Sequence, residues 1–289
     1  MSYQSLLARF WSLPVLRVPG KPLLERRVWT VECGHAAGLR LRYPQNPDYV
    51  HGSSERPVQE ALAGRLCRGD VFYDIGANVG FFSLLAARLV GPGGYVCAFE
   101  PHPRNAATVA ANAALNAMPH LRVFEVAVGA FARRDELLMT EWDGGATLSG
   151  LPLGPSAPVA RAAVEVVPLD EFVPAHGLPL PTFVKIDVEG AEVEVIDGMV
   201  RTIEQSRPVL LYEVDDGDEG VFRRRWDELD RRVRGLGYDV TRLENAYPGL
   251  KWYVGHSIAM PDGCGAAQPI SKVAPAPRVV GSPNERGGG

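Results

Sequence analysis

The sequence is poor in cysteine, and it lacks the long apolar runs that mark membrane and exported proteins. Four cysteines in 289 residues, none of them in a CxxC pair, exclude a disulfide scaffold and a cysteine-based zinc site. The four are Cys33, Cys67, Cys97 and Cys264. Three of them fall in or beside apolar runs, so we expect buried thiols in a reducing cytoplasm. Arg9, Pro14, Arg17 and Pro19 interrupt the apolar residues of the N-terminal segment. No apolar run there is long enough for a signal-peptide core of ~7–15 residues or a membrane span of ~20.

An excess of charge of one sign is also lacking. The 30 lysines and arginines nearly balance the 34 aspartates and glutamates, which leaves a net charge of −4. A chain so balanced presents no broad basic surface for nucleic acid, and it favours a small-molecule partner. With 46% apolar and 22% charged residues the chain can bury a sizeable core, which excludes wholesale disorder and a coiled coil. Its length leaves one domain or two open.

From residue 70 onward, short β-rich apolar runs alternate with helical stretches. Strands are predicted over 71–76, 95–100, 121–128, 183–188 and 208–214. Helices are predicted over 78–90, 103–116, 191–205 and 221–236. Such alternation is typical of βαβ units, in which a parallel sheet is covered by helices on both faces.

The end of the chain follows another pattern. Strands predicted over 238–243 and 251–260 are joined by a turn too short for a parallel return, so they must form an antiparallel hairpin. The sequence therefore predicts an α/β protein with the three-layer, Rossmann-like class I methyltransferase fold. Its sheet would have seven mostly parallel strands and a C-terminal antiparallel hairpin.

Three segments surround or interrupt this plan. Residues 50–260 form the predicted catalytic domain. Residues 1–49 are predicted to cap it, with a helix over 3–13 and strands over 28–33 and 39–44. A further helix is predicted over 56–67. Residues 129–182 are an insertion, in which strands over 135–142 and 164–172 flank a lid that contains Trp142 and would shape the acceptor pocket. Residues 261–289 are predicted to be a disordered tail.

The glycine-rich stretch DIGANVGFF, at 74–82, carries the first chemical signal. Gly76 and Gly80 let the chain turn sharply from strand to helix, so that helix N–H groups face a ligand. A dinucleotide-binding turn has a glycine where this sequence has Asn78, whose side chain would obstruct a pyrophosphate. This difference favours S-adenosylmethionine over NAD(P).

Further cofactor contacts are expected at the ends of the next two strands. Glu100 lies 24 residues after Gly76 and can accept two hydrogen bonds from ribose hydroxyls, a role that NAD sites share. Ala127 and Val128 would contact the adenine through backbone and apolar atoms. The predicted cofactor-binding residues are Asp74, Gly76, Asn78, Gly80, Phe81, Glu100, Ala127, Val128 and Asp187.

The fourth parallel strand ends in FVKIDVEGAE, which places Asp187 where ligands of open α/β sheets bind. Glu189 either shares this position or caps the helix that begins near Gly190. Carboxylates that gather at this edge favour a cationic sulfonium over an anionic pyrophosphate. Asp187 and Glu213 are candidate ligands for a divalent cation, or they flank the turn as solvated acids.

If the acceptor group must lose a proton during methyl transfer, the site needs a base that takes the proton or a metal that makes it easier to lose. Asp187 is the leading candidate because of its position at the strand end. His102, just beyond Glu100, is the second predicted catalytic residue, and His51 and His256 are further candidates.

Several motifs together resemble one family. DIGANVGFFSLLAA, AFEPHP, the LD of VPLDEF, FVKIDVEGAEVEVIDG and RPVLLYEV look like the FkbM-type S-adenosylmethionine-dependent methyltransferases, over about residues 50–215. The resemblance implies O-methylation of a hydroxyl on a sugar, glycolipid or secondary metabolite. A NAD(P)-dependent oxidoreductase and a non-catalytic relative that binds partners through the acidic turn at 213–219 are the alternatives. The acceptor and the oligomeric state stay open.

Nucleic acid is not expected as the acceptor. The fourth strand continues as IDVEG, where methylases of DNA amino groups carry an Asn/Asp-Pro-Pro-aromatic turn. The arginine-rich stretch over 221–236 has apolar residues at helical spacing, so it predicts an amphipathic surface helix with mixed charges on its solvated face.

Overall fold

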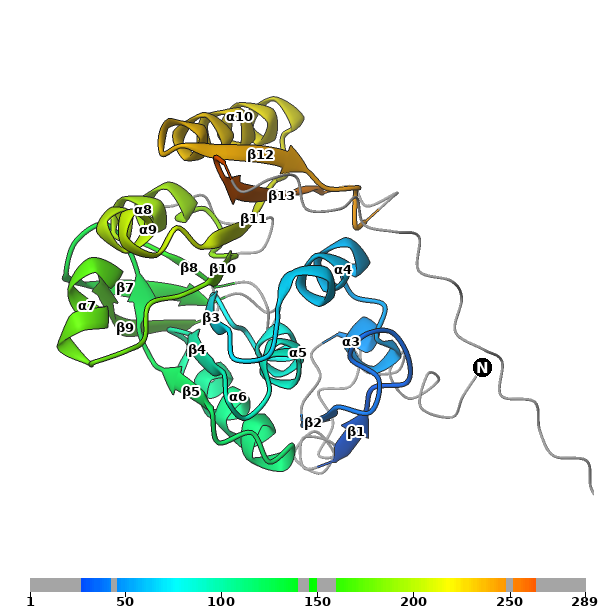
Figure 1. The fold of residues 1–289 in the computed structure, drawn as a ribbon. Coiled ribbons are helices and arrows are strands. Elements are labelled where there is room, and N and C mark those ends of the chain that lie inside the picture. Colours follow the sequence, from blue (N-terminus) through cyan, green and yellow to red (C-terminus); the bar gives the residue numbers. More distant parts are fainter. Residues whose placement is uncertain (1–26, 43–45, 140–145, 150–159, 248–251, 264–289) are drawn as a thin grey trace, which may run out of the picture.

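A seven-stranded sheet forms the centre of the protein, and helices cover both of its faces (Figure 1). The computed structural model describes residues 27–42, 46–139, 146–149, 160–247 and 252–263. Five strands run parallel: β3 (Val71–Ile75), β4 (Tyr95–Phe99), β5 (Leu121–Phe124), β10 (Phe183–Ile186) and β11 (Val209–Asp216). β13 (Tyr253–Pro261) pairs antiparallel with β11 and with β12 (Tyr238–Arg242). The strand order β12-β13-β11-β10-β3-β4-β5 confirms the predicted class I plan and its hairpin.

Each face of the sheet has its own apolar core, because alternate residues of a strand point to opposite sides. Phe72 belongs to the core that includes residues of α4 (Arg56–Arg65), α5 (Phe81–Val90) and α6 (Pro103–Leu115). Its neighbour Tyr73 belongs to the core that includes residues of α8 (Glu192–Asp197), α9 (Val200–Ser206) and α10 (Glu219–Gly235). The middle of the sheet is thus buried on both sides, and polar side chains gather at the strand ends.

The prediction of a single helix over residues 191–205 is wrong, because the structure has two helices there, α8 and α9. A Cβ atom on Gly198 would lie only 2.0 Å from the carbonyl oxygen of Gly129, so the chain passes too close there for a side chain. Asp170 then accepts a hydrogen bond of 2.9 Å from the amide of Arg201 at the start of α9. The break between α8 and α9 lies where both helices contact the insertion. Helical periodicity in the sequence does not reveal such contacts.

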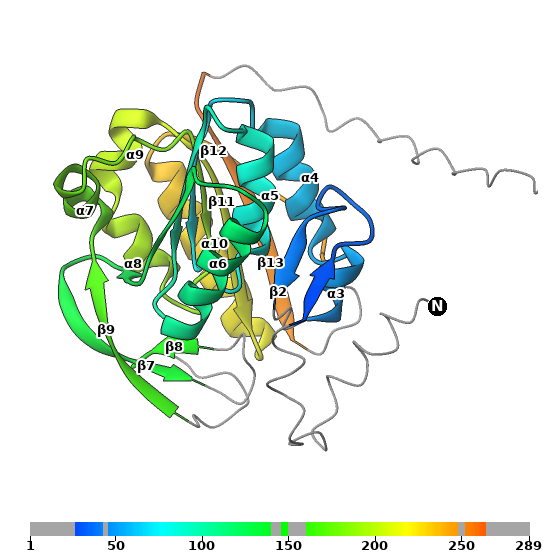
Figure 2. The same ribbon diagram turned by 90° about the horizontal axis from the view of Figure 1, so that it is seen from below.

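The third strand, predicted over 121–128, is also divided. Its second part, β6 (Ala127–Val128), leaves the main sheet and pairs in parallel with β9 (Ala160–Val167). β7 (Arg133–Met139) pairs antiparallel with β9 and with β8 (Ala146–Leu148), which completes a second, four-stranded sheet beside the first (Figure 2). The strand predicted over 164–172 ends at Val167, and α7 (Leu169–Ala175) follows.

An N-terminal hairpin packs against α6. Its strands, β1 (Val28–Thr30) and β2 (Arg40–Arg42), pair antiparallel and fall within the two strands predicted there. The amides of Arg40 and Arg42 donate to the side-chain oxygens of Asn116 and Asn112, at 2.9 and 2.7 Å. α3 (Pro47–His51) and α4 follow β2 along the chain.

Parts of the predicted organisation lie outside the described residues: the helix over 3–13, Trp142 with most of the lid, Cys264 and the tail from 264. Cys97 is buried as predicted, whereas Cys33 and Cys67 are exposed, because they lie in loops after β1 and α4. Among the described helices, none is long and apolar enough to cross a membrane. The domain boundaries at residues 49 and 260 stay predictions.

Candidate functional site

The turn between β3 and α5 is shaped by backbone that only small or flexible residues adopt. Gly76 has a φ of 82°, and a Cβ atom on it would lie 1.7 Å from the carbonyl oxygen of Asp187. Asn78 also lies in the left-handed region, with a φ of 51°. The amides of Gly76 and Ala77 donate to the carbonyl oxygen of Phe99, at 3.0 and 3.2 Å. The turn is therefore pressed between the ends of β4 and β10, as its glycines require.

Glu100 follows β4 and faces this turn. Its two carboxylate oxygens accept hydrogen bonds from the backbone amides of Asn78 (2.7 Å) and His102 (2.9 Å). Burial raises the pKa of Glu100 to about 7, although the two amides oppose the shift, and the charges of Asp74 and Asp187 add to it. The carboxylate is thus held in one orientation beside the turn, and each oxygen keeps a lone pair for a ligand.

A cavity of about 200 Å³ joins the turn to the ends of the neighbouring strands. Seven predicted site residues line it: Gly76, Asn78, Glu100, Ala127, Val128, Asp187 and Glu213. Apolar residues add to the lining, among them Leu137 of β7 and Leu148 of β8. These two belong to the second sheet, so the insertion supplies part of the wall.

Four predicted site residues stand behind the cavity wall. Asp74 is fully buried and accepts a hydrogen bond of 2.5 Å from the hydroxyl of Ser83. Gly80 packs over Val109, and the ring of Phe81 stacks on Tyr49 at 4.8 Å. His102 caps α6 through Nδ1, which accepts from the amide of Arg104. None of the four lines the cavity, and their direct roles in binding or catalysis stay predictions.

A buried lysine fixes the carboxylate of Asp187. Lys185 Nζ donates to Asp187 Oδ2 at 2.8 Å and lies 3.8 Å from Asp74 Oδ1, with the ring of Phe82 at 5.1 Å. Burial opposes the charge of Lys185, but the carboxylates of Asp187 and Asp74 outweigh it and raise the lysine's pKa. Lys185 is one of four lysines in the chain and lies within an apolar strand. A charged residue in such a strand is the one feature of the sequence that could have predicted a buried ion pair here.

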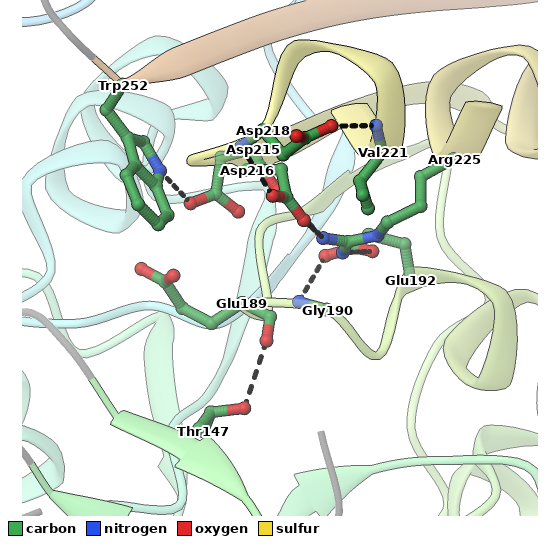
Figure 3. Close-up of polar contacts among 10 residues, drawn as sticks. All are labelled: Thr147, Glu189, Gly190, Glu192, Asp215, Asp216, Asp218, Val221, Arg225 and Trp252. Atoms are coloured by element: carbon green, nitrogen blue, oxygen red, sulfur yellow. Dashed lines mark hydrogen bonds and ion pairs between the residues drawn. The ribbon is translucent and has the colours of Figure 1, made fainter. Parts of the chain in front are cut away.

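Glu189 extends toward Asp215 and Trp252 (Figure 3). The indole of Trp252 donates to Asp215 at 2.6 Å, and the carbonyl oxygen of Glu189 accepts from the hydroxyl of Thr147 at 3.0 Å. Burial, and then the charges of Asp215 and Asp187, raise the pKa of Glu189 well above its ordinary value. The start of α8 has no side-chain cap, so of the two roles considered for Glu189 the structure supports the position in the cavity.

The other acids near this turn are committed to an ion-pair network. Arg225 of α10 pairs with Asp216 at 3.3 Å and with Glu192 at 3.0 Å, as Figure 3 shows. These carboxylates therefore serve the packing of α10. The two predicted cation ligands also differ from each other, because Asp187 is already bonded to Lys185, whereas Glu213 is paired with a histidine.

That histidine is His256 of β13, one of the candidate bases. Its Nε2 lies 2.6 Å from Glu213 Oε2 and 3.3 Å from Glu55 Oε2. Burial lowers the pKa of His256, but the two carboxylates outweigh burial and raise it to about 10. The pKa of Glu213 is raised to about 8 by burial and the charge of Asp187, against the effect of His256. His51, by contrast, pairs with Glu32 at 3.0 Å outside the cavity.

Three of the cavity residues that the sequence did not predict come from segments far from the motifs. Tyr49 of α3, Glu55 before α4 and Tyr247 before β13 line the end that Asp187 and Glu213 share. The hydroxyl of Tyr247 donates to Glu55 Oε1 at 3.0 Å. No motif marks these positions in the sequence, because their proximity depends on how the N-terminal segment folds over the sheet edge.

The sheet order, the glycine turn and the acid after β4 define a class I, Rossmann-like, S-adenosylmethionine-dependent methyltransferase. The sequence matches the family described as "Methyltransferase FkbM domain" over residues 74–240, more than half of the chain. The chain belongs to the FkbM methyltransferase family. Glu55 and His256 lie outside the matched segment.

Among characterised proteins, the chain is similar to 31-O-demethyl-FK506 methyltransferase FkbM of Streptomyces tacrolimicus. The two are 29% identical over an alignment 237 residues long, and the match covers 69% of this chain and 88% of the relative. Among solved structures it is similar to methyltransferase FkbM from Methylobacillus flagellatus KT, at 19% identity and a TM-score of 0.46. That match covers 72% of this chain and only 49% of the other, about half of its length. A SAM-dependent methyltransferase from Aquifex aeolicus matches at 11% identity and a TM-score of 0.44, covering 75% and 94%.

Proposed function

We propose that the protein is a cytoplasmic O-methyltransferase, which methylates a hydroxyl of a small molecule such as a sugar, a glycolipid or a secondary metabolite. One observation carries the proposal: a single cavity joins the glycine turn and Glu100 to the carboxylates of Asp187 and Glu213. A cofactor and an acceptor would thus meet within one cavity. The FkbM relative, named for methylation of an oxygen on FK506, supports an oxygen acceptor.

The cofactor end suits S-adenosylmethionine. The side-chain oxygen of Asn78 is buried and has no hydrogen-bond partner in the part of the chain that the structure describes, so it is available to a ligand. Glu100 would hold the ribose hydroxyls, and Ala127 and Val128 would contact the adenine. Acidic side chains surround the cavity and no lysine or arginine is among its described lining residues, which suits a positive sulfonium better than a pyrophosphate and argues against NAD(P).

The acceptor end would orient the hydroxyl and exclude water. S-adenosylmethionine, when bound, supplies a methyl group activated by its positively charged sulfur. We assign to Asp187 the alignment of the acceptor hydroxyl, because Lys185 holds its carboxylate at the end of β10. Tyr49 and Tyr247 line this end, and their aromatic rings would help to exclude water from the acceptor. His102 does not reach the cavity, so the catalytic proposal is kept for Asp187 alone.

Calorimetry and a transfer assay test this function. We expect the full-length chain to bind S-adenosylmethionine or S-adenosylhomocysteine, and not NAD(H). We also expect it to transfer label from methyl-labelled S-adenosylmethionine to members of a panel of glycosylated and hydroxylated metabolites. Micromolar affinity for NAD(H) without affinity for S-adenosylmethionine would overturn the assignment. Cofactor binding with label transferred only to amine or thiol acceptors would refute the O-methyltransferase activity.

A further inference from the structure

Three side chains converge at the acceptor end of the cavity from distant parts of the chain. They are Glu55 at the start of α4, Glu213 of β11 and His256 of β13. One ligand atom of each lies within 4.8 Å of the other two. The side chains of His256 and Glu55 are 1% and 7% exposed, and Glu213 lines the cavity at 16%.

Among the described residues, well-aligned hydrogen bonds satisfy only part of this cluster, although His256 forms ion pairs with both carboxylates. His256 Nε2 is close to both carboxylates, yet neither contact has the geometry of a hydrogen bond. Glu55 Oε2 is buried and also has no hydrogen-bond partner among the described residues. Buried polar atoms without well-aligned hydrogen bonds are costly, and a ligand that contacts all three side chains would satisfy them.

Two of the three separations in the cluster come close to the spacing of donor atoms around one metal ion. Donors that bind one ion at ~2.1 Å lie roughly 3.0–3.4 Å apart in tetrahedral or octahedral geometry. The separations of 2.6 and 3.3 Å from His256 Nε2 to Glu213 and Glu55 lie close to this range. The first would open by a few tenths of an ångström around an ion.

The backbone and the neighbouring side chains hold the donors in place. Glu55 has a φ of 43°, a left-handed conformation that is costly for a glutamate and is retained where surrounding structure imposes it. The hydroxyl of Tyr247 donates to its other oxygen, as residues around metal ligands commonly do. Glu213 and His256 are directly paired across β11 and β13, so their side chains emerge on the same face.

We propose that Glu55, Glu213 and His256 form a binding site for a divalent transition-metal ion, open toward the acceptor cavity. One imidazole nitrogen and two carboxylate oxygens suit Mn²⁺, Fe²⁺ or Zn²⁺ better than Mg²⁺ or Ca²⁺, which prefer oxygen alone. Two carboxylates and a neutral imidazole carry two negative charges, which a divalent ion neutralises. Three protein ligands leave coordination positions free on the cavity side.

The site would also give the acceptor hydroxyl a route to ionisation. An oxygen bound to such an ion loses its proton more readily than a free alcohol does. This catalytic consequence rests on the proposed function, but metal binding itself does not. The competing arrangement is a protonated His256 that pairs with both carboxylates and leaves no room for an ion.

A titration with Mn²⁺ distinguishes the two arrangements without any methyl transfer. The full-length chain is stripped with a chelator, exchanged into buffer and titrated, and free Mn²⁺ is followed by electron paramagnetic resonance. We expect one saturable site per chain, from which Zn²⁺ displaces Mn²⁺. Glu55→Gln and His256→Gln should each weaken binding at least ~10-fold. Glu32→Gln and His51→Gln, which remove the ion pair outside the cavity, are matched controls and should bind as the wild type does.

Two results would overturn the proposal. One is the absence of saturable Mn²⁺ or Zn²⁺ binding by the folded wild-type chain at millimolar concentration. The other is an affinity unchanged by Glu55→Gln, which would identify an adventitious surface site. Calorimetry with S-adenosylhomocysteine reports whether each variant keeps its fold and cofactor end. If His256→Gln does not fold, Tyr247→Phe replaces it, because it keeps all three donors and should still weaken Mn²⁺ binding about tenfold.

Discussion

Cofactor affinity should depend on pH through Glu100. Burial places the pKa of this carboxyl at about 7, and a ribose donates its hydroxyl hydrogen bonds best to the ionised form. With that pKa, the ionised fraction falls from about 0.9 at pH 8 to about 0.1 at pH 6. Affinity for S-adenosylhomocysteine should therefore be about tenfold lower at pH 6 than at pH 8.

The stability of the free protein should change in the opposite direction. The folded pKa of Glu100 is above the ordinary value of 4.5, so the folded chain retains a proton that the unfolded chain has lost between these values. Glu100 thus contributes stability below pH 4.5 that is lost as the pH rises through 7, and the difference corresponds to about 3 kcal/mol as an upper bound. Cofactor binding and unfolding free energy should thus respond to pH with opposite signs.

Calorimetric titration with S-adenosylhomocysteine between pH 6 and 8 measures the first effect. Glu100→Gln keeps the size of the side chain but cannot ionise, so it should bind about 10–100-fold more weakly at pH 8, with the pH dependence gone. Glu125→Gln, at an exposed position after β5, is the matched control and should behave as the wild type. Equal affinities at pH 6 and 8, or the same pH dependence in Glu100→Gln, would refute this role of Glu100.

Three further substitutions test the rest of the site. Gly76→Ala would place a Cβ atom 1.7 Å from a carbonyl oxygen at positive φ, so calorimetry should detect no cofactor binding by this variant. Gly93 has open space around it, so Gly93→Ala is the control and should bind the cofactor normally. Lys185→Met would leave Asp74 buried without its cation and should lower the unfolding free energy in urea by ~3–5 kcal/mol, with partial recovery on adding Asp74→Asn. Asp187→Ala should reduce kcat in the transfer assay at least ~100-fold while cofactor affinity changes less, and an unchanged kcat would remove Asp187 from the mechanism.

Much of the cofactor end could be predicted because it depends on local rules. The turn that follows β3 requires left-handed backbone, and glycine at position 76 signals that requirement directly. Glu100 and Asp187 stand immediately after short apolar runs, and parallel strands bring such residues to one edge of a sheet. The packing of Asp74 behind that edge could not be predicted, because the motif does not reveal which of its side chains face inward.

The acceptor end depended on contacts between segments that no spacing relates. Glu55 and His256 are 201 positions apart, and they meet because the N-terminal segment packs over the edge formed by β11 and β13. The break between α8 and α9 has a similar origin, in the close approach of Gly198 to Gly129. Neither contact leaves a periodic trace in the sequence.

The sequence by itself determined the layered fold, the hairpin at the sheet edge, the family and most of the residues that line the cavity near the glycine turn, because alternating apolar runs and a glycine turn act over a few residues at a time. Only the tertiary structure decided which carboxylates are paired, which face the cavity and which meet His256. Charge pairing and burial depend on distances through space, and the order of residues along the chain does not specify those distances.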